Sequence, residues 1–304
     1  MRILVAIPHY VRPSAEGRPG EGRYAALYAG ADRRVAALAD CLTALATLFA
    51  PARCVIDHAR RTARVVPADV PHVLDVVICT TRGHHVLDRL PVEPRYYTAC
   101  DTGAEPELLG FACHDVLAGR LGGYDYYCYL EDDLVLSDPW FFLKLAWFSA
   151  GAGDDKLLQP NRFEAGLGFA IPKVYVDGDL APHCTAPFPT ATAPPLQALD
   201  VLGQRVIFER ARNPHSGCFF LNARQMAHWA RQPHFADRRS RFIGPLETAA
   251  TLGILRTFAV YKPAASCADF LEVRHHGTGY LAQLAPRPDS SFSETINRNK
   301  ESPS

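Results

Sequence analysis

The stretch that decides the fold covers residues 126–138 and reads Tyr-Tyr-Cys-Tyr-Leu-Glu-Asp-Asp-Leu-Val-Leu-Ser-Asp. Its apolar and aromatic residues lead directly into three carboxylates, Glu131, Asp132 and Asp133, and a second apolar run follows them at once. Carboxylates at the mouth of a core repel one another, and burying them without partners is costly. Because hard oxygen ligands suit Mg²⁺ or Mn²⁺, the pattern favours a divalent cation at a strand end over a solvated acidic turn.

A continuous apolar run at residues 3–7 and a largely apolar segment at 73–79 precede this stretch. Such runs are typical of strands that are buried on both faces of a parallel sheet. Apolar residues at helical spacing over 33–49 and 106–121 predict helices between the strands. The alternation of strands and helices predicts an α/β fold: an open, mostly parallel sheet with flanking helices, in a single Rossmann-like domain whose strand ends form the site.

The second half of the chain is less regular. Asp138 is predicted to cap a helix that begins at Pro139, and a strand at 217–221 enters a helix capped by Asn222. A further helix is predicted from Gly244 to Arg256, followed by strands at 259–263 and 270–274. Residues 181–195 are predicted to form a surface loop with the character of a lid. The polar, aperiodic residues 286–304 predict a disordered tail, which leaves 1–285 as one domain.

Composition limits the partners and the compartment. The 304 residues contain 32 basic and 32 acidic side chains, so no charge surplus points to nucleic acid. Nine cysteines without any CxxC pair favour free thiols in a reducing cytosol over a zinc or dithiol site. The N-terminal apolar run is too short for a signal peptide, and no window is long enough for a transmembrane segment. We therefore expect a cytoplasmic protein.

A strand followed by Glu131-Asp132-Asp133 and an apolar turn resembles the DXD motif of GT-A-fold glycosyltransferases. The chain is most similar to the family-2-like and N-acetylglucosaminyltransferase-I-like members, over roughly residues 1 to 285. This resemblance implies a GT-A fold and a hexosyltransferase-type enzyme that moves a sugar from a nucleoside-diphosphate sugar donor to a hydroxyl of a glycan or other acceptor. It implies Mn²⁺ or Mg²⁺ as cofactor, with Asp133 as metal ligand, Asp132 facing ribose or metal, and Glu131 in support.

The resemblance also indicates donor-binding residues. Pro8 and Tyr10, after the first strand, lie where the nucleotide base is expected, and Arg12 is placed to meet a phosphate. Thr80 and Arg82 follow the second strand at the same sheet edge. Ser216 and Gly217 form a small turn that lets backbone amides approach the donor sugar. Each of these residues also has a simpler interpretation as an ordinary loop or turn residue.

Glu247 is the predicted general base, because similar inverting enzymes carry an acidic residue at the start of a helix after this turn. A carboxylate in the first turn of a helix is also favoured by the helix dipole, so the position alone does not decide its role. Of the tandem histidines, His276 is preferred over His275 as a further metal ligand. Arg162 and Lys173 are assigned to the diphosphate on charge alone, and His114 is expected on a helix surface.

Two alternatives remain open. A metal-dependent nucleotidyltransferase would also bind a nucleotide through paired acids, although its usual loop after the first strand contains lysine, and residues 12–23 have none. The other alternative is a degenerate GT-A domain that binds a sugar without catalysis. The complete acidic triplet and Glu247 favour an enzyme.

Overall fold

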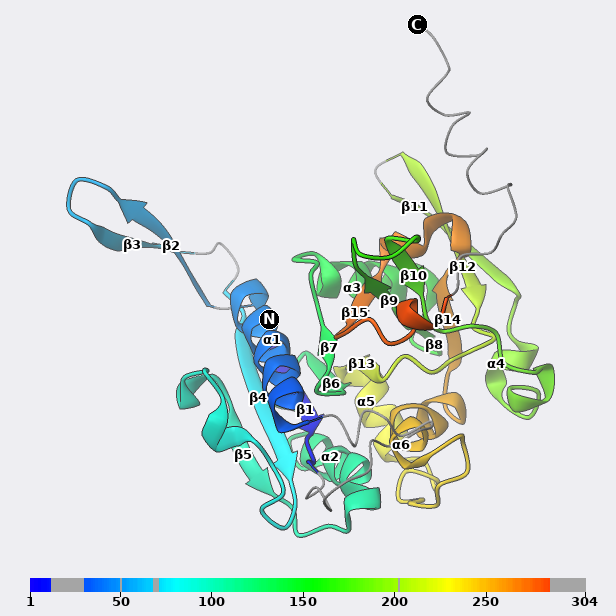
Figure 1. Ribbon diagram of the computed structural model, residues 1–304. Coiled ribbons are helices and arrows are strands. Elements are labelled where there is room, and N and C mark those ends of the chain that lie inside the picture. Colours follow the sequence, from blue (N-terminus) through cyan, green and yellow to red (C-terminus); the bar gives the residue numbers. More distant parts are fainter. Residues whose placement is uncertain (12–29, 50, 68–70, 202, 285–304) are drawn as a thin grey trace, which may run out of the picture.

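The computed structural model describes residues 1–11, 30–49, 51–67, 71–201 and 203–284. Its central sheet has five strands in the order β13-β6-β1-β4-β5 (Figure 1). The strands are β1 (Arg2–Pro8), β4 (Val73–Thr80), β5 (Thr98–Asp101), β6 (Tyr126–Leu130) and β13 (Cys218–Asn222). β1, β4, β5 and β6 run parallel, and β13 pairs antiparallel with β6.

Helices cover both faces of this sheet. One face packs against α1 (Ala31–Phe49) and α3 (Phe141–Ala152), and the other against α2 (Leu109–Ala118), α5 (Ala223–Ala230) and α6 (Pro245–Leu255). Successive residues of β1 enter the two cores alternately, with Val5 in one and Leu4 in the other. Because both faces are covered, the strands read as continuous apolar runs rather than as alternating ones.

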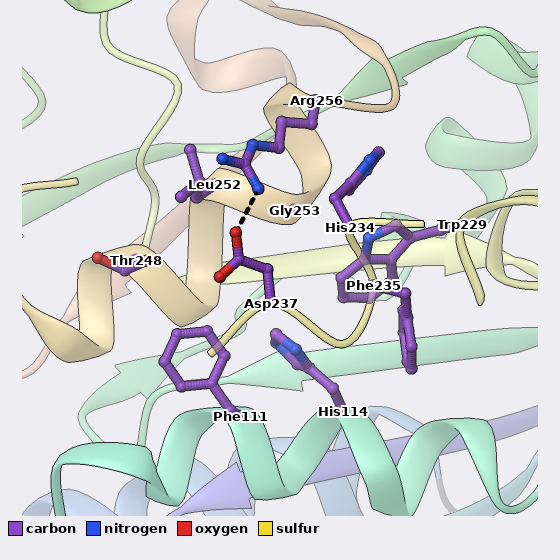
Figure 2. A pocket seen from close by; sticks show the side chains of 10 residues that line it. All are labelled: Phe111, His114, Trp229, His234, Phe235, Asp237, Thr248, Leu252, Gly253 and Arg256. Carbon is purple, nitrogen blue, oxygen red and sulfur yellow. Dashed lines mark hydrogen bonds and ion pairs between the residues drawn. The ribbon is translucent and has the colours of Figure 1, made fainter. Parts of the chain in front are cut away.

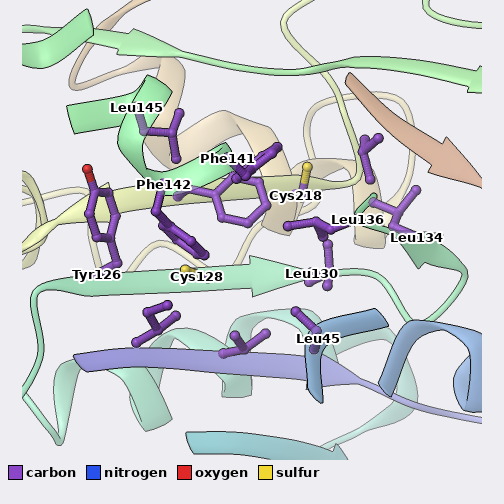
Figure 3. Packing of buried hydrophobic residues seen from close by; sticks show 14 of the residues in the cluster. Leu45, Tyr126, Cys128, Leu130, Leu134, Leu136, Phe141, Phe142, Leu145 and Cys218 are labelled. Carbon is purple, nitrogen blue, oxygen red and sulfur yellow. The ribbon is translucent and has the colours of Figure 1, made fainter. Parts of the chain in front are cut away.

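The core beneath α3 is rich in aromatic side chains (Figure 3). Phe142 packs against Tyr126 of β6 with ring centroids 4.9 Å apart, and Phe141 contacts Phe220 of β13 at 4.7 Å. Burial of one such side chain contributes about 1.5–3 kcal/mol. These contacts hold β6 rigidly up to its last residue, Leu130, after which the carboxylates begin.

Two smaller sheets and a hairpin complete the structure. The sheets have the orders β10-β9-β15-β7 and β11-β12-β14-β8, and β2 pairs with β3. Their strands are β2 (Ala52–Asp57), β3 (Thr62–Pro67), β7 (Leu134–Val135), β8 (Lys156–Leu158), β9 (Asn161–Ala165), β10 (Lys173–Tyr175), β11 (Leu196–Val201), β12 (Gln204–Arg210), β14 (Ala259–Pro263) and β15 (Glu272–His275). The predicted α/β class is thus confirmed, but the strands form several mixed sheets rather than one open sheet. The chain leaves β6 for β7 through the acidic triplet, which therefore lies where two sheets meet.

Several predicted boundaries are confirmed. Asn222 caps α5, since its side chain accepts from the Gln225 amide at 2.9 Å and the Gln225 side chain accepts from the Asn222 amide at 3.1 Å. The helix from Gly244 and the strand at 259–263 lie where they were predicted. The start of α3 is wrong by two residues: Asp138 accepts from the Trp140 amide and pairs with a lysine, and the helix begins at Phe141.

The expected lid at 181–195 is anchored to the body of the protein. It contains the short helix α4 (Pro189–Thr192), whose buried Thr190 hydroxyl accepts from the Val260 amide at 3.0 Å. The hydroxyl of Tyr261 donates to the Pro194 carbonyl at 2.6 Å. Arg12 and the predicted tail at 286–304 lie outside the described residues. All nine cysteines are free thiols, as expected. None of the helices in the described ranges combines the length and apolar character needed to cross a bilayer.

Candidate active site

Asp132, at the centre of the triplet, is buried and paired with two side chains from the N-terminal part of the chain. Arg34 of α1 donates to both of its carboxylate oxygens. His9, just after β1, lies 2.5 Å from Asp132 through Nδ1, and its Nε2 accepts from the Val86 amide, so the ring hydrogen is on Nδ1. Burial acts to raise the pKa of Asp132, but Arg34 and His9 outweigh it and hold that pKa below its usual value. Asp132 thus ties β1 and α1 to the end of β6.

Asp133 has one oxygen without a partner among the residues that the structure describes. Its Oδ2 lies 3.6 Å from an Arg34 nitrogen and 3.8 Å from Nε2 of His275, whereas its buried Oδ1 has no hydrogen-bond partner within the described ranges. His275 is held in place by Glu164, which is fully buried and accepts from His275 Nδ1 at 2.9 Å. Since a neutral imidazole that donates through Nδ1 leaves Nε2 as an acceptor, a ligand nitrogen faces the free carboxylate.

The neighbouring His276 is turned the other way. Its backbone amide donates to the Asp133 carbonyl at 2.7 Å, but its Nε2 lies 3.5 Å from Asp40 of α1. Successive side chains of an extended strand point to opposite sides, so only one of the two imidazoles is able to face Asp133. The geometry favours His275 over the predicted His276 as the histidine of this site.

Glu131 faces β13 and α6, on the opposite side of the chain from Asp132. Burial, together with the charges of Asp133 and Glu247, raises the pKa of Glu131 to about 8. Gly217, in the turn before β13, leaves room for this carboxyl group: a Cβ there would lie 2.6 Å from Glu131 Oε2, and its φ of +64° disfavours any other residue. Gly217 thus accommodates Glu131, and its predicted role in letting backbone amides approach a donor sugar stays a prediction.

Glu247 lies in the first turn of α6, which begins at Pro245 after the N-cap Gly244. Its charge acts to raise the pKa values of Glu131 and Tyr129. α6 packs closely against α2, because α2 carries Gly110, where a Cβ would lie 2.7 Å from Ala249. Glu247 thus acts electrostatically on Glu131 from the first turn of α6.

A second buried charge cluster adjoins Glu131. Asp177 accepts from Arg162 at 2.7 Å and from Lys262 at 2.8 Å, and Lys262 also donates to the His215 carbonyl at 2.9 Å. Although burial opposes it, these two cations hold the pKa of Asp177 below its usual range. Arg162 also acts to lower the pKa of Glu131. The cluster supplies positive charge beside the triplet, and the assignment of Arg162 to a diphosphate stays a prediction.

Most donor-binding candidates lie at the carboxyl edge of the central sheet. Pro8 and Thr80 end β1 and β4, and Tyr10 packs edge-on against His84 with ring centroids 5.7 Å apart. Arg82 is turned toward Glu105, with which it forms an ion pair. Ser216 is buried and donates its hydroxyl to the Pro160 carbonyl at 2.9 Å. Arg82 and Ser216 are therefore engaged within the protein.

Two further expectations are not met. Lys173 pairs with Glu272 at 2.5 Å at the edge of the β10-β9-β15-β7 sheet. His114 is buried, not on a helix surface: its Nε2 donates to the Ala249 carbonyl at 3.0 Å, and its ring lies 4.9 Å from that of Trp229. The cavity that it lines with Trp229 and Asp237 has a volume of about 10 Å³, room for one water molecule at most (Figure 2). This cavity is too small for a substrate.

The burial of His114 should make the stability of the protein depend on pH. Burial, followed by the charge of Arg238, lowers the pKa of His114 to about 3, against about 6.5 in an unfolded chain. The unfolded state therefore binds a proton that the native state does not bind, and the free energy of unfolding falls as the pH drops below 6.5. Between pH 7 and pH 4 this loss should be about 3 kcal/mol. In urea denaturation, His114→Gln should remove this part of the pH dependence, and His58→Gln, at an exposed site, should not.

The residues around Asp133 fit a divalent cation in part. Within the described ranges, no set of three or more histidine, cysteine, aspartate or glutamate side chains is arranged to hold a metal ion by itself. Asp133 and His275 offer two ligands, and Mg²⁺ in nucleotide enzymes commonly takes its remaining ligands from water and substrate phosphates. The unpartnered Asp133 Oδ1 is the observation that supports this fit.

Comparison with known proteins gives no name to this site. No family model matches the chain, and a search of curated proteins found no match.

Sequence reasoning missed several residues of the site: His9, Arg34, Glu164, Asp177 and Lys262. Arg34 lies within the helix predicted over 33–49, and His9 follows the first predicted strand. Nothing local in the sequence shows that either residue meets Asp132. The members of the second cluster, Asp177, Arg162 and Lys262, are single charged residues at or near short strands. One signal was present, because a charged residue inside an apolar run such as Val260-Tyr261-Lys262 needs a buried partner.

Proposed function

We propose that this protein is a metal-dependent glycosyltransferase of GT-A type, which transfers a sugar from a nucleoside-diphosphate sugar to an acceptor hydroxyl. The observation that carries the proposal is the acidic triplet at the end of β6, which lies between β13 and β1 in a sheet that is parallel except for β13. There Asp133 Oδ2 lies 3.8 Å from Nε2 of the oriented His275 imidazole, and the buried Asp133 Oδ1 has no hydrogen-bond partner among the described residues. Ligands of open α/β sheets bind at this carboxyl edge.

The charge distribution supports a diphosphate in this place. Asp133 and His275 would hold the Mn²⁺ or Mg²⁺ ion, which when bound offsets negative charge on the leaving diphosphate. The two positive charges of Arg162 and Lys262 exceed the single negative charge of Asp177, and this cluster lies on the side of Glu131. The base would lie near Pro8, Tyr10 and Thr80, at the ends of β1 and β4.

Glu247 is the proposed general base. It is half-buried in the first turn of α6, and its charge acts on Glu131. Glu131, with its pKa raised to about 8, holds its proton at neutral pH. A carboxyl group that stays protonated at neutral pH is a common component of acid–base sites. Glu247 would take the proton of the acceptor hydroxyl as that oxygen attacks the anomeric carbon, which inverts its configuration.

The direct test is to incubate the protein with Mn²⁺ and a panel of UDP-, GDP- and TDP-sugars, and to measure nucleotide release and thermal shift. Release of nucleoside diphosphate that depends on an added acceptor is the expected result. Release of pyrophosphate would instead indicate a nucleotidyltransferase. A thermal shift without turnover would indicate a sugar-binding domain, which the pairing of Asp132 with Arg34 and His9 would suit.

The two proposed metal ligands can be tested separately from turnover. In titration calorimetry with Mn²⁺ and nucleoside diphosphate, Asp133→Asn and His275→Gln should each weaken metal uptake by about 10-fold or more. His276→Gln is the matched control, because its imidazole faces Asp40 and should leave uptake within about 2-fold of the parent. Loss of uptake in the His276 variant alone would show that the tandem pair was assigned the wrong way round.

A further inference from the structure

The β2–β3 hairpin projects from the molecule on the side of α1 and β4 (Figure 1). Its strands, Ala52–Asp57 and Thr62–Pro67, pair only with each other in the part of the chain that the structure describes. A two-stranded hairpin is marginally stable alone in water, and both of its edges offer unpaired backbone groups. An element of this kind needs a partner surface to account for its exposure.

The hairpin exposes large apolar side chains on both faces. Cys54 pairs across the strands with Val65, and Ile56 pairs with Ala63, so these four residues share one face. Ile56 is 63% exposed and Val65 is 59% exposed. Val55, on the opposite face, is 50% exposed. One apolar face of a strand pair normally packs against a core. Among the described residues, neither face of this hairpin is packed in that way.

Positive charge is concentrated on the same element. The hairpin and its turn carry four arginines against one aspartate, although the whole chain has a net charge of zero: Arg53, Arg60, Arg61, Arg64 and Asp57. Asp57 pairs with Arg60 at 2.9 Å. The other three arginines are exposed and have no ion-pair partner among the described residues.

We propose that this hairpin docks the protein on an anionic membrane surface. Apolar side chains beside unpaired arginines match the interfacial layer of a bilayer, where chain methylenes and lipid phosphates lie within a few ångströms of each other. A polyanion in solution would use the arginines but would leave Ile56, Val55 and Val65 in water. A protein partner seated on one face would leave the other face uncovered, whereas lipid surrounds a shallowly inserted hairpin on both.

A second copy of this chain is a less suitable occupant. One face of two six-residue strands covers about 200 Å², from the rise per residue and the strand spacing. A stable interface buries about 800 Å² on each partner. Face-to-face pairing of two hairpins would therefore bury much less area than a stable interface requires. Adsorption to lipid has no such minimum area. This inference is independent of the proposed glycosyltransferase activity.

Flotation of the full-length protein with vesicles tests the proposal. The protein should float with vesicles of equal parts phosphatidylcholine and phosphatidylglycerol, and not with phosphatidylcholine alone. Binding should be lost in 1 M salt, where the screening length is about 3 Å. The variant R53Q/R61Q/R64Q should bind about 100-fold more weakly, because each arginine near such a surface contributes about 5-fold. I56S/V65S should bind about 10-fold more weakly.

Matched variants control for charge and hydropathy. R95Q/R205Q/R231Q removes three exposed arginines elsewhere, and L121S/L196S removes two exposed leucines, so both should bind vesicles as the parent does. Circular dichroism and melting temperature confirm that each variant folds. Equal binding by R53Q/R61Q/R64Q and the parent, or no binding of the parent to anionic vesicles, overturns the proposal. So does a dimer in sedimentation equilibrium that the hairpin variants dissociate in the absence of vesicle binding.

Discussion

Replacement of Arg34 by methionine is expected to destabilise the protein by about 3–5 kcal/mol at pH 7, since it leaves a buried carboxylate without its main counter-charge. Arg34 donates to both oxygens of Asp132, which is 3% exposed, and its other terminal nitrogen lies 3.6 Å from Asp133. His9 remains as a neighbour in the variant but supplies one hydrogen bond only. Urea denaturation followed by circular dichroism measures the loss.

A second substitution, at Asp132, separates the cost of an unpaired charge from the cost of lost packing. Asp132→Asn in the Arg34→Met background removes the charge, and we expect it to recover at least half of the lost stability. The matched control is Arg33→Met, at the exposed neighbouring position of α1, which should change stability by less than about 0.5 kcal/mol. If Arg34→Met costs as little as Arg33→Met, Arg34 is not the counter-charge of the triplet.

The sheet could be predicted because its strands are buried on both faces. β1 and β6 contain unbroken apolar runs, β4 is apolar apart from Asp75 and its last residue Thr80, and the helices between the strands carry apolar residues at helical spacing. The same burial made the triplet visible, since charged residues that end such a run must meet a partner. The prediction named an ion as that partner. The structure shows that part of the charge is balanced within the chain by Arg34, while His9 donates a hydrogen bond to the same carboxylate.

The remaining contacts depend on distance along the chain. Arg34 and Asp132 are 98 positions apart, and Glu164 and His275 are 111 apart, so no local pattern joins them. The short strands of the smaller sheets give a weak signal for the same reason, because two to seven residues carry little periodicity. The β2–β3 hairpin was also missed, although β-branched residues on either side of a polar turn at 58–61 were a usable signal.

Glu247→Gln is expected to lower kcat for sugar transfer by about 100- to 10,000-fold, the contribution of a positioned general base. Glutamine keeps the shape of the side chain but accepts no proton at neutral pH. Binding of the nucleoside diphosphate and Mn²⁺ should stay within about 2-fold of the parent, because the metal ligands are Asp133 and His275 in this proposal. Steady-state kinetics and calorimetry on the same preparation distinguish these two effects.

The alternative explanation for Glu247 is the helix dipole, which favours a carboxylate in any first turn. Glu107 provides the comparison, because it occupies the first turn of the 3₁₀ segment Pro106–Leu108 that leads into α2, is exposed, and lies on a different element. If the dipole were the whole reason for Glu247, Glu247→Gln and Glu107→Gln would each cost less than about 1 kcal/mol of stability and leave kcat unchanged. A base role predicts the loss of kcat in Glu247→Gln alone.

The electrostatic effect of Glu247 on Glu131 can be tested separately. The pKa of Glu131 should fall in Glu247→Gln, since the charge of Glu247 helps to raise it. Titration of Glu131 by NMR thus reports on the interaction between the two carboxyl groups even where turnover is not measured.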